Sequence, residues 1–333
     1  MQQFLKRVRL FSLVGIVLLL PILVSYVYFD PFKVIKNYTD YSYSYIATNR
    51  DVISTTMFIR NYPKYHYNSF ILGSSRTMGF KPKTWQKYLT NKDTTFMFDA
   101  SGETIFGIYT KLKYLDEMEI KINNVLIILC RTSTFLENKT MHLFVKHPAV
   151  SKESHLFFQM QFFKAYLNPK FLFYLYTYKI SKTYTPAMEG YIENRKITYD
   201  TLTNEISIID QEAEITNFPA EYYAKRKDIF YARTKEKIDP VPRINKEYLW
   251  MLKEIKEILR KNKTSFKVVL SPLYEQIKFN PTDLKLLKEV FGDNLYDFTG
   301  KNAFTDNQTN YYETNHFRPI VGDSIFKVIY KNK

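Results

Sequence analysis

Cysteine is almost absent from this sequence, which has only Cys130 among its 333 residues. A single cysteine excludes a disulfide framework and any metal site built from several cysteines. Glycine is also scarce, with nine residues, which excludes collagen-like chains and flexible glycine linkers. The formal net charge is +15, yet no run of five or more basic residues occurs. Because a nucleic-acid-binding protein concentrates such charge in one stripe, we expect a solvated basic surface and no nucleic-acid partner.

What is present favours a folded body. Hydrophobic residues make up 45% of the chain and charged residues 24%, which is enough to bury a sizeable core and excludes a mostly disordered protein. The length allows one large domain or two small ones.

The N-terminus carries the longest uncharged stretch. Residues 11–29 contain no charge and follow Lys6, Arg7 and Arg9. As a helix, these residues would extend roughly 29 Å, close to the hydrocarbon thickness of a bilayer. The basic cluster predicts that the N-terminus lies inside. The end of the stretch lacks the small residues of a signal-peptide cleavage site, so we expect an uncleaved anchor and a body on the far side of the membrane.

The rest of the chain alternates between strand-like and helix-like segments. Short apolar runs predict strands, and amphipathic segments between them predict helices. The strands fall at 69–72, 95–98, 125–129, 266–270 and 295–298, and the helices at 83–89, 103–118, 246–261, 281–291 and 320–330. This order predicts an α/β fold, specifically a three-layer, flavodoxin-like sandwich around a parallel five-stranded sheet.

Three regions follow from this pattern. We expect an anchor at 1–30, a polar, tyrosine-rich membrane-proximal connector at 31–67, and the α/β domain at 68–333 with an insertion at about 131–245. Within the insertion, the residues around 196–208 predict a β-hairpin. Phe or Tyr occupies ten of the 22 positions from 157 to 178, which indicates either a helical layer over an ordinary core or a surface that docks on the membrane or a membrane partner.

A glycine and two serines follow the first predicted strand. Gly73, Ser74 and Ser75 would form a turn at its carboxyl end, where open α/β sheets place their ligands. Acyl transfer needs a nucleophile and donors for an oxyanion, and such a turn supplies a hydroxyl surrounded by backbone N–H groups. Most Gly-Ser-Ser sequences are only turns, and either serine could be exposed here. Arg76 comes next, either to clamp an anionic group or to form a structural ion pair.

A carboxylate and a histidine precede the last predicted helix. Glu313 lies three residues before His316, and one turn of chain would let it orient the imidazole and stabilise the imidazolium. The alternative is a histidine in an ordinary surface loop. The remaining histidines have no such partner and no metal-like spacing, so we interpret them as structural; they are His66, His142, His147 and His155.

These blocks, in this order, resemble the SGNH (GDSL-like) hydrolase superfamily. The resemblance implies that Ser75 is the nucleophile, that His316 is the general base, and that Glu313 stands in for the usual aspartate. It also implies that Gly102 is the oxyanion donor of the second block, with Gly73 and Arg76 beside the substrate. No metal or cofactor is expected.

The third block departs from the superfamily pattern. An asparagine is expected after the third strand, but Cys130, Arg131 and Thr132 stand there, and Arg131 or Thr132 would have to supply the missing donor. The chain is similar to the membrane-anchored DltD-like and alginate O-acetylation proteins. That resemblance implies a single-pass protein of the bacterial cytoplasmic membrane with a periplasmic or extracytoplasmic body. Its partners would be a membrane-bound O-acyltransferase and an envelope polysaccharide or other acyl-carrying substrate.

Two functions of different classes follow. The first is a serine acyltransferase or esterase that acts on O-acyl groups of an envelope polymer. The second is a non-catalytic partner of a membrane-bound O-acyltransferase, which the missing asparagine favours. A third, weaker interpretation is an envelope-polymer binding protein that uses the +15 charge.

Overall fold

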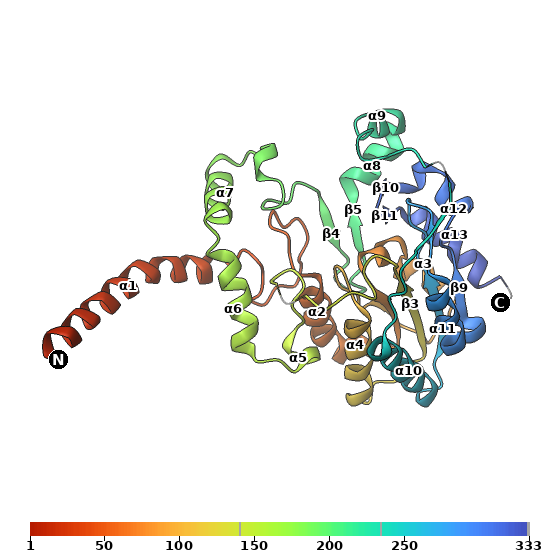
Figure 1. Cartoon of the computed structure of the whole chain (residues 1–333), viewed down its shortest axis with the longest axis horizontal. Coiled ribbons are helices and arrows are strands. Elements are labelled where there is room, and N and C mark those ends of the chain that lie inside the picture. The colour runs from red at the N-terminus through yellow and green to blue at the C-terminus, as the bar shows by residue number, and fades with distance from the viewer. Residues whose placement is uncertain (140, 234, 332–333) are drawn as a thin grey trace.

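A parallel five-stranded sheet forms the centre of the protein (Figure 1). The computed structural model describes residues 1–139, 141–233 and 235–331. The sheet strands are β1 (Ser69–Gly73), β2 (Thr95–Met97), β3 (Asn124–Leu129), β7 (Ser265–Leu270) and β9 (Leu295–Asp297), in the order β2-β1-β3-β7-β9. All neighbouring strands pair in parallel. The predicted α/β class with a parallel five-stranded sheet is therefore confirmed.

Two groups of helices cover the sheet. The helices are α3 (Pro82–Gln86), α4 (Ile105–Glu117), α10 (Lys246–Lys261), α11 (Pro281–Phe291) and α13 (Pro319–Ile329). Helix α10 packs against both α4 and α11. Trp85 of α3 instead donates a hydrogen bond to Tyr330, which follows α13. Because the strand order reverses direction at β1, right-handed crossovers place these two groups on opposite faces of the sheet.

Half of the predicted connector belongs to the core of the body. Helix α2 (Arg50–Tyr65) buries Ile53, Met57 and Phe58 in the main hydrophobic core. The ring of Phe58 stacks on that of Phe98, just after β2, with centroids 5.1 Å apart. Apolar side chains four residues apart give α2 a buried face, so this segment does more than link the anchor to the body.

In its described residues, the region between β3 and α10 contains five α-helices among loops. It contains α5 (Pro148–Ser151), α6 (His155–Tyr166), α7 (Pro169–Ser181), α8 (Ile209–Asn217) and α9 (Pro219–Ala224). The predicted hairpin is confirmed, because β4 (Ile197–Tyr199) pairs in antiparallel orientation with β5 (Ile206–Ile208). Three further short elements are β6 (Lys237–Ile238), β8 (Ile277–Lys278) and α12 (Ala303–Asp306), of which β6 and β8 pair in parallel.

The N-terminal helix α1 (Gln2–Phe29) extends away from the body, and its last turns lie beside α6 and α7 (Figure 1). It is the one helix in the described part of the chain that is long and apolar enough to cross a membrane. Its Tyr26 joins a second, smaller hydrophobic core, which contains Phe32 of the connector together with Phe162 and Leu175 of the insertion. The insertion and the base of α1 thus share one core.

Candidate active site

The turn after β1 presents Ser75 at the carboxyl edge of the sheet. Strand β1 ends at Gly73, and the chain enters the 3-10 helix η1 (Ser75–Gly79). Gly73 has φ +147°, and a Cβ there would lie 2.5 Å from the Ile128 carbonyl oxygen of β3. Only glycine allows β1 to leave the sheet this close to β3. Gly73 therefore shapes the turn that carries the serine.

A two-stranded ribbon brings the histidine to the serine. The ribbon pairs β10 (Tyr311–Glu313) with β11 (His316–Phe317) and places Glu313 opposite His316. The Phe317 ring packs directly on Gly79 of η1 and edge-on against Phe80, with centroids 5.8 Å apart. Because Gly79 has no side chain, β11 approaches η1 closely enough for His316 to reach Ser75.

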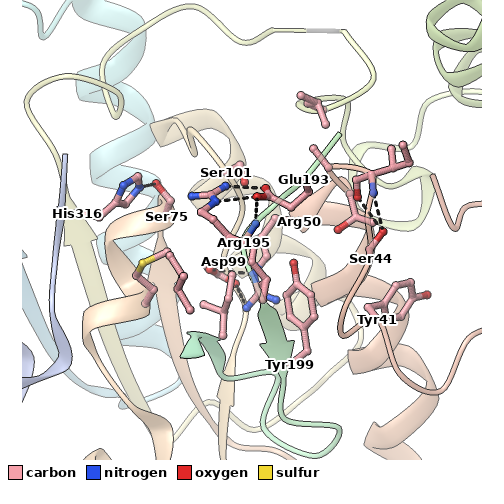
Figure 2. Close-up of a pocket in the computed structure, with 18 of the residues that line it drawn as sticks. Tyr41, Ser44, Arg50, Ser75, Asp99, Ser101, Glu193, Arg195, Tyr199 and His316 are labelled. Carbon is pink, nitrogen blue, oxygen red and sulfur yellow. Dashed lines mark hydrogen bonds and ion pairs between the residues drawn. The ribbon is translucent and has the colours of Figure 1, made fainter. Parts of the chain in front are cut away.

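Ser75, His316 and Glu313 form a continuous hydrogen-bonded chain. The Ser75 Oγ lies 2.7 Å from His316 Nε2 (Figure 2). On the other side of the ring, Nδ1 hydrogen-bonds Glu313 Oε1, while the second carboxylate oxygen accepts the Asn315 N–H at 2.6 Å. Ser74, by contrast, is fully buried. The hydroxyl next to an imidazole is thus that of Ser75.

The Glu313 carboxyl is held in its ionised form. Burial disfavours the charge, but the hydrogen bond and charge of His316, the Asn315 N–H and the nearby Arg76 together lower the pKa of Glu313. An ionised carboxylate at Nδ1 keeps the proton on that nitrogen and leaves Nε2 free to accept the serine proton.

A cavity of about 270 Å³ opens over the serine–histidine pair. Its walls combine apolar side chains with two arginines, both paired. Arg50 of α2 forms a 2.8 Å ion pair with Asp99, and Arg195 forms a 2.7 Å ion pair with Glu193. Figure 2 shows the Arg195–Glu193 pair and Ser75 among the residues that line this cavity. None of these four residues was predicted, because they come from a helix, a loop and an insertion that carry no motif.

Gly73, Gly102 and Arg76, the residues predicted to hold the oxyanion and the substrate, do not line the cavity. Gly102 has φ +58°, and a Cβ there would lie 3.0 Å from the Phe144 ring; its neighbour Ser101 lines the cavity, and Gly102 does not. Arg76 is buried and donates hydrogen bonds to Thr132 at 3.1 Å and Asn315 at 3.4 Å. Among the described residues, Arg76 forms no ion pair, but its charge acts on the Glu313 carboxylate, whose pKa it helps to lower.

Arg131 and Thr132, the residues in the place of the third-block asparagine, have different surroundings. The Arg131 guanidinium forms ion pairs with Asp239 and, at 2.5 Å, with Glu275. It is thereby held in a structural pair. The Thr132 hydroxyl lies 3.1 Å from the Cys130 sulfur and accepts the Arg76 hydrogen bond. Arg76 thus bridges the turn after β3 and the loop that carries His316.

A buried charge network supports the loop after β2. The Lys111 ammonium is fully buried and forms 3.0 Å ion pairs with Asp51 and Glu103. It also donates to the Asp99 carbonyl oxygen at 2.8 Å. Burial disfavours its charge, but the surrounding carboxylates raise the pKa of Lys111. The network fixes the position of Asp99 and, through it, of one wall of the cavity.

A second cavity of about 410 Å³ adjoins the first. The two share the wall residues Ile46, Ala47 and Leu143, and α6 and α7 supply much of the remaining lining of the second. In the described ranges, no group of three or more His, Cys, Asp or Glu side chains could hold a metal ion.

Fold and site together define an α/β protein with a serine–histidine–glutamate chain at the carboxyl edge of its sheet. Comparison with known protein families finds no family model that matches the chain, and no curated protein matches it either. The function is therefore argued from the geometry.

Proposed function

We propose that this protein is a membrane-anchored SGNH-type serine acyltransferase or esterase that acts on O-acyl groups of a bacterial envelope polysaccharide or related polymer. The observation that carries the proposal is the contact between Ser75 and His316, which lie 241 positions apart in the chain. The flavodoxin-like strand order supports the SGNH type, since the second strand precedes the first and the others follow in sequence.

The reaction proceeds in two halves. Ser75 Oγ attacks the carbonyl carbon of an acyl ester while His316 Nε2 takes its proton, and Glu313 stabilises the imidazolium that forms. The tetrahedral intermediate then expels the alcohol, which receives that proton from Nε2, and the acyl group remains on Ser75. In the second half, a polysaccharide hydroxyl or water gives its proton to Nε2 and attacks the acyl carbonyl carbon. The second tetrahedral intermediate then breaks its bond to Ser75 Oγ, which takes that proton back from Nε2, and the acyl group leaves as a new ester or a free acid.

The developing oxyanion needs donors close to Ser75. The Ser75 N–H opens η1 and has no partner within that turn. The second donor of this proposal is Gly102, which does not itself line the cavity but belongs to the loop after β2 whose Ser101 does. Arg76, which follows Ser75 in the chain, adds a positive charge that favours both the ionised Glu313 and a developing oxyanion. Because the third-block asparagine is missing, this proposal assigns its part in binding the oxyanion to Arg76 and Thr132, which are hydrogen-bonded to each other.

The anchor and the partner complete the proposal. Helix α1 crosses the cytoplasmic membrane once, with Lys6, Arg7 and Arg9 on the cytoplasmic side and the body outside. There the body works beside a membrane-bound O-acyltransferase. The second cavity, which adjoins the catalytic one and is lined by α6 and α7, gives an acyl group or glycan unit room next to Ser75.

One observation favours a non-catalytic binding partner. The turn after β3 has no asparagine, and Arg131, which stands in that turn, is held by Asp239 and Glu275. In that function, the cavity would bind an acylated glycan without cleaving it. The complete hydrogen-bonded chain gives the catalytic function precedence, because binding alone does not require an oriented imidazole at a serine.

Labelling with a serine-reactive fluorophosphonate tests the proposal. We expect the full-length protein in detergent to be labelled, Ser75→Ala to lose all labelling, and His316→Ala to lose nearly all of it. Ser271→Ala is a matched control, because Ser271 also follows a sheet strand at this edge but lies outside the cavity. Absence of labelling in the folded wild-type protein would refute catalysis and leave the binding partner.

A further inference from the structure

The last turns of α1 are packed against α6 and α7. The Ser25 hydroxyl lies 2.7 Å from the Tyr166 hydroxyl of α6. The ring of Phe29 meets Tyr176 of α7 edge-on, with centroids 6.1 Å apart. Ile22 packs against the same small core. Two helices of the insertion therefore flank the final two turns of the proposed membrane span.

The length of that span determines the depth of these contacts. The uncharged stretch of α1, between Arg9 and Asp30, is twenty residues long. As a helix they measure about 30 Å, which is the thickness of the hydrocarbon core with nothing to spare. Residues 22–29 must then lie within the outer half of the bilayer. Helices α6 and α7, which contact them, lie at the level of the lipid interface.

The outer faces of these two helices are apolar and exposed. On α6, Leu156 and Met160 are 71% and 57% exposed, while Phe162 on the opposite face is fully buried. On α7, Phe173 is 65% exposed and Ile180 85%. Tyr176 lies between them on the same face and contacts α1. The exposed stripe is therefore continuous with the side of the membrane helix.

The charge of this segment fits a lipid surface. Residues 155–188 contain no aspartate or glutamate, and their basic side chains are Lys164, Lys170, Lys179 and Lys182. Interfacial helices typically combine an exposed apolar face with lysines that contact anionic head groups. A surface that binds a protein partner commonly carries both acidic and basic side chains, so the absence of acidic residues favours a lipid surface.

We propose that α6 and α7 are seated in the outer lipid interface of the membrane that α1 crosses, as a second attachment of the body. This inference rests on the proposed membrane anchoring of α1. The two attachments together fix the orientation of the body and bring the second cavity, lined by both helices, close to the lipid surface.

Depth-dependent quenching in lipid nanodiscs tests the seating. Single cysteines at Leu20, Met160, Phe173 and Ile320 of the full-length protein would carry an environment-sensitive fluorophore. Discs of phosphatidylglycerol and phosphatidylcholine, with one protein copy each, would contain nitroxide-labelled acyl chains. Ile320 on α13 is the matched control, since its 57% exposure equals that of Met160. Cys130 is fully buried, and the wild-type protein measures its background labelling.

We expect strong quenching at positions 20, 160 and 173 and none at position 320. Quenching at 20 with none at 160 and 173 would show that α6 and α7 do not lie in the lipid interface, although α1 spans the membrane. The exposed face would then be assigned to a protein partner. Quenching equal at 160 and 320 would also overturn the seating, because adsorption would then be unspecific. Absence of quenching at 20 would refute the anchor and the seating together, without bearing on the serine chemistry.

Discussion

Replacing Glu313 by glutamine removes one charge and leaves the shape of the side chain almost unchanged. In the wild-type protein, both carboxylate oxygens accept hydrogen bonds, one from His316 Nδ1 and the other from the Asn315 N–H. An amide has only one oxygen, so it cannot satisfy both donors. In the Glu313→Gln variant the side-chain amide can take two orientations, and each leaves one of the two donors without an acceptor.

The magnitude follows from the better-satisfied orientation. If the amide oxygen accepts the Asn315 N–H, the amide NH₂ faces Nδ1, and the imidazole must carry its proton on Nε2. That tautomer cannot accept the proton of Ser75, 2.7 Å away. If the amide flips, two N–H groups oppose each other at a cost of about 1–3 kcal/mol. Because the flip restores the productive tautomer, the tautomer itself accounts for about 1–3 kcal/mol of the loss. The lost carboxylate charge, which stabilises the imidazolium, accounts for the rest of an expected rate loss of about 10⁴-fold, equivalent to roughly 5.5 kcal/mol, and smaller than that of Ser75→Ala or His316→Ala.

The assay is the second-order rate of fluorophosphonate labelling at neutral pH, with hydrolysis of a simple aryl acetate as a second readout. Glu236→Gln is the matched control, since Glu236 pairs with Lys278 at 2.9 Å, accepts the Lys301 N–H at 2.7 Å and does not line the cavity. It should stay within about twofold of wild type. A loss of less than about tenfold in Glu313→Gln would refute the tautomer argument.

Four further outcomes are expected. Lys111→Met should destabilise the protein by about 3–5 kcal/mol in urea titrations because it leaves buried carboxylates uncompensated, whereas the exposed Lys113→Met should change little; equal effects would contradict the network. Burial opposes ionisation of Asp51, but the buried lysines lower its pKa from 3.8 to about 2. Its stabilisation is therefore present above about pH 4 and should be lost as the pH falls toward 2, and unchanged urea midpoints over that range would exclude it. Gly73→Ala should lower both the melting temperature and the labelling rate, since its φ of +147° and the nearby β3 carbonyl exclude a Cβ; wild-type values would contradict this. Protease added outside spheroplasts should digest the body, and digestion only after lysis would refute the orientation deduced from residues 11–29.

Local patterns were sufficient for the elements of the α/β body. The run 125–129 and the segment 246–261 were predicted as a strand and a helix, and they form β3 and α10. These predictions succeed because burial of a strand, and the apolar face of a helix, are both encoded within one short segment. The role of 50–65 in the core was missed, because a polar and tyrosine-rich composition hides the buried face formed by Ile53, Met57 and Phe58.

The sequence by itself determined which residues had the chemistry of a triad: a serine after the first strand, and a glutamate three residues before a histidine. The resemblance favoured Ser75 over Ser74, but only the tertiary structure showed that the Ser75 hydroxyl meets His316, because the contact depends on Phe317 packing on Gly79 of η1. Only the tertiary structure showed that Arg195 and Glu193 line the cavity and that Arg131 forms ion pairs with Asp239 and Glu275. Each of these contacts joins segments distant in the chain, and their energies depend on packing that no local sequence pattern records.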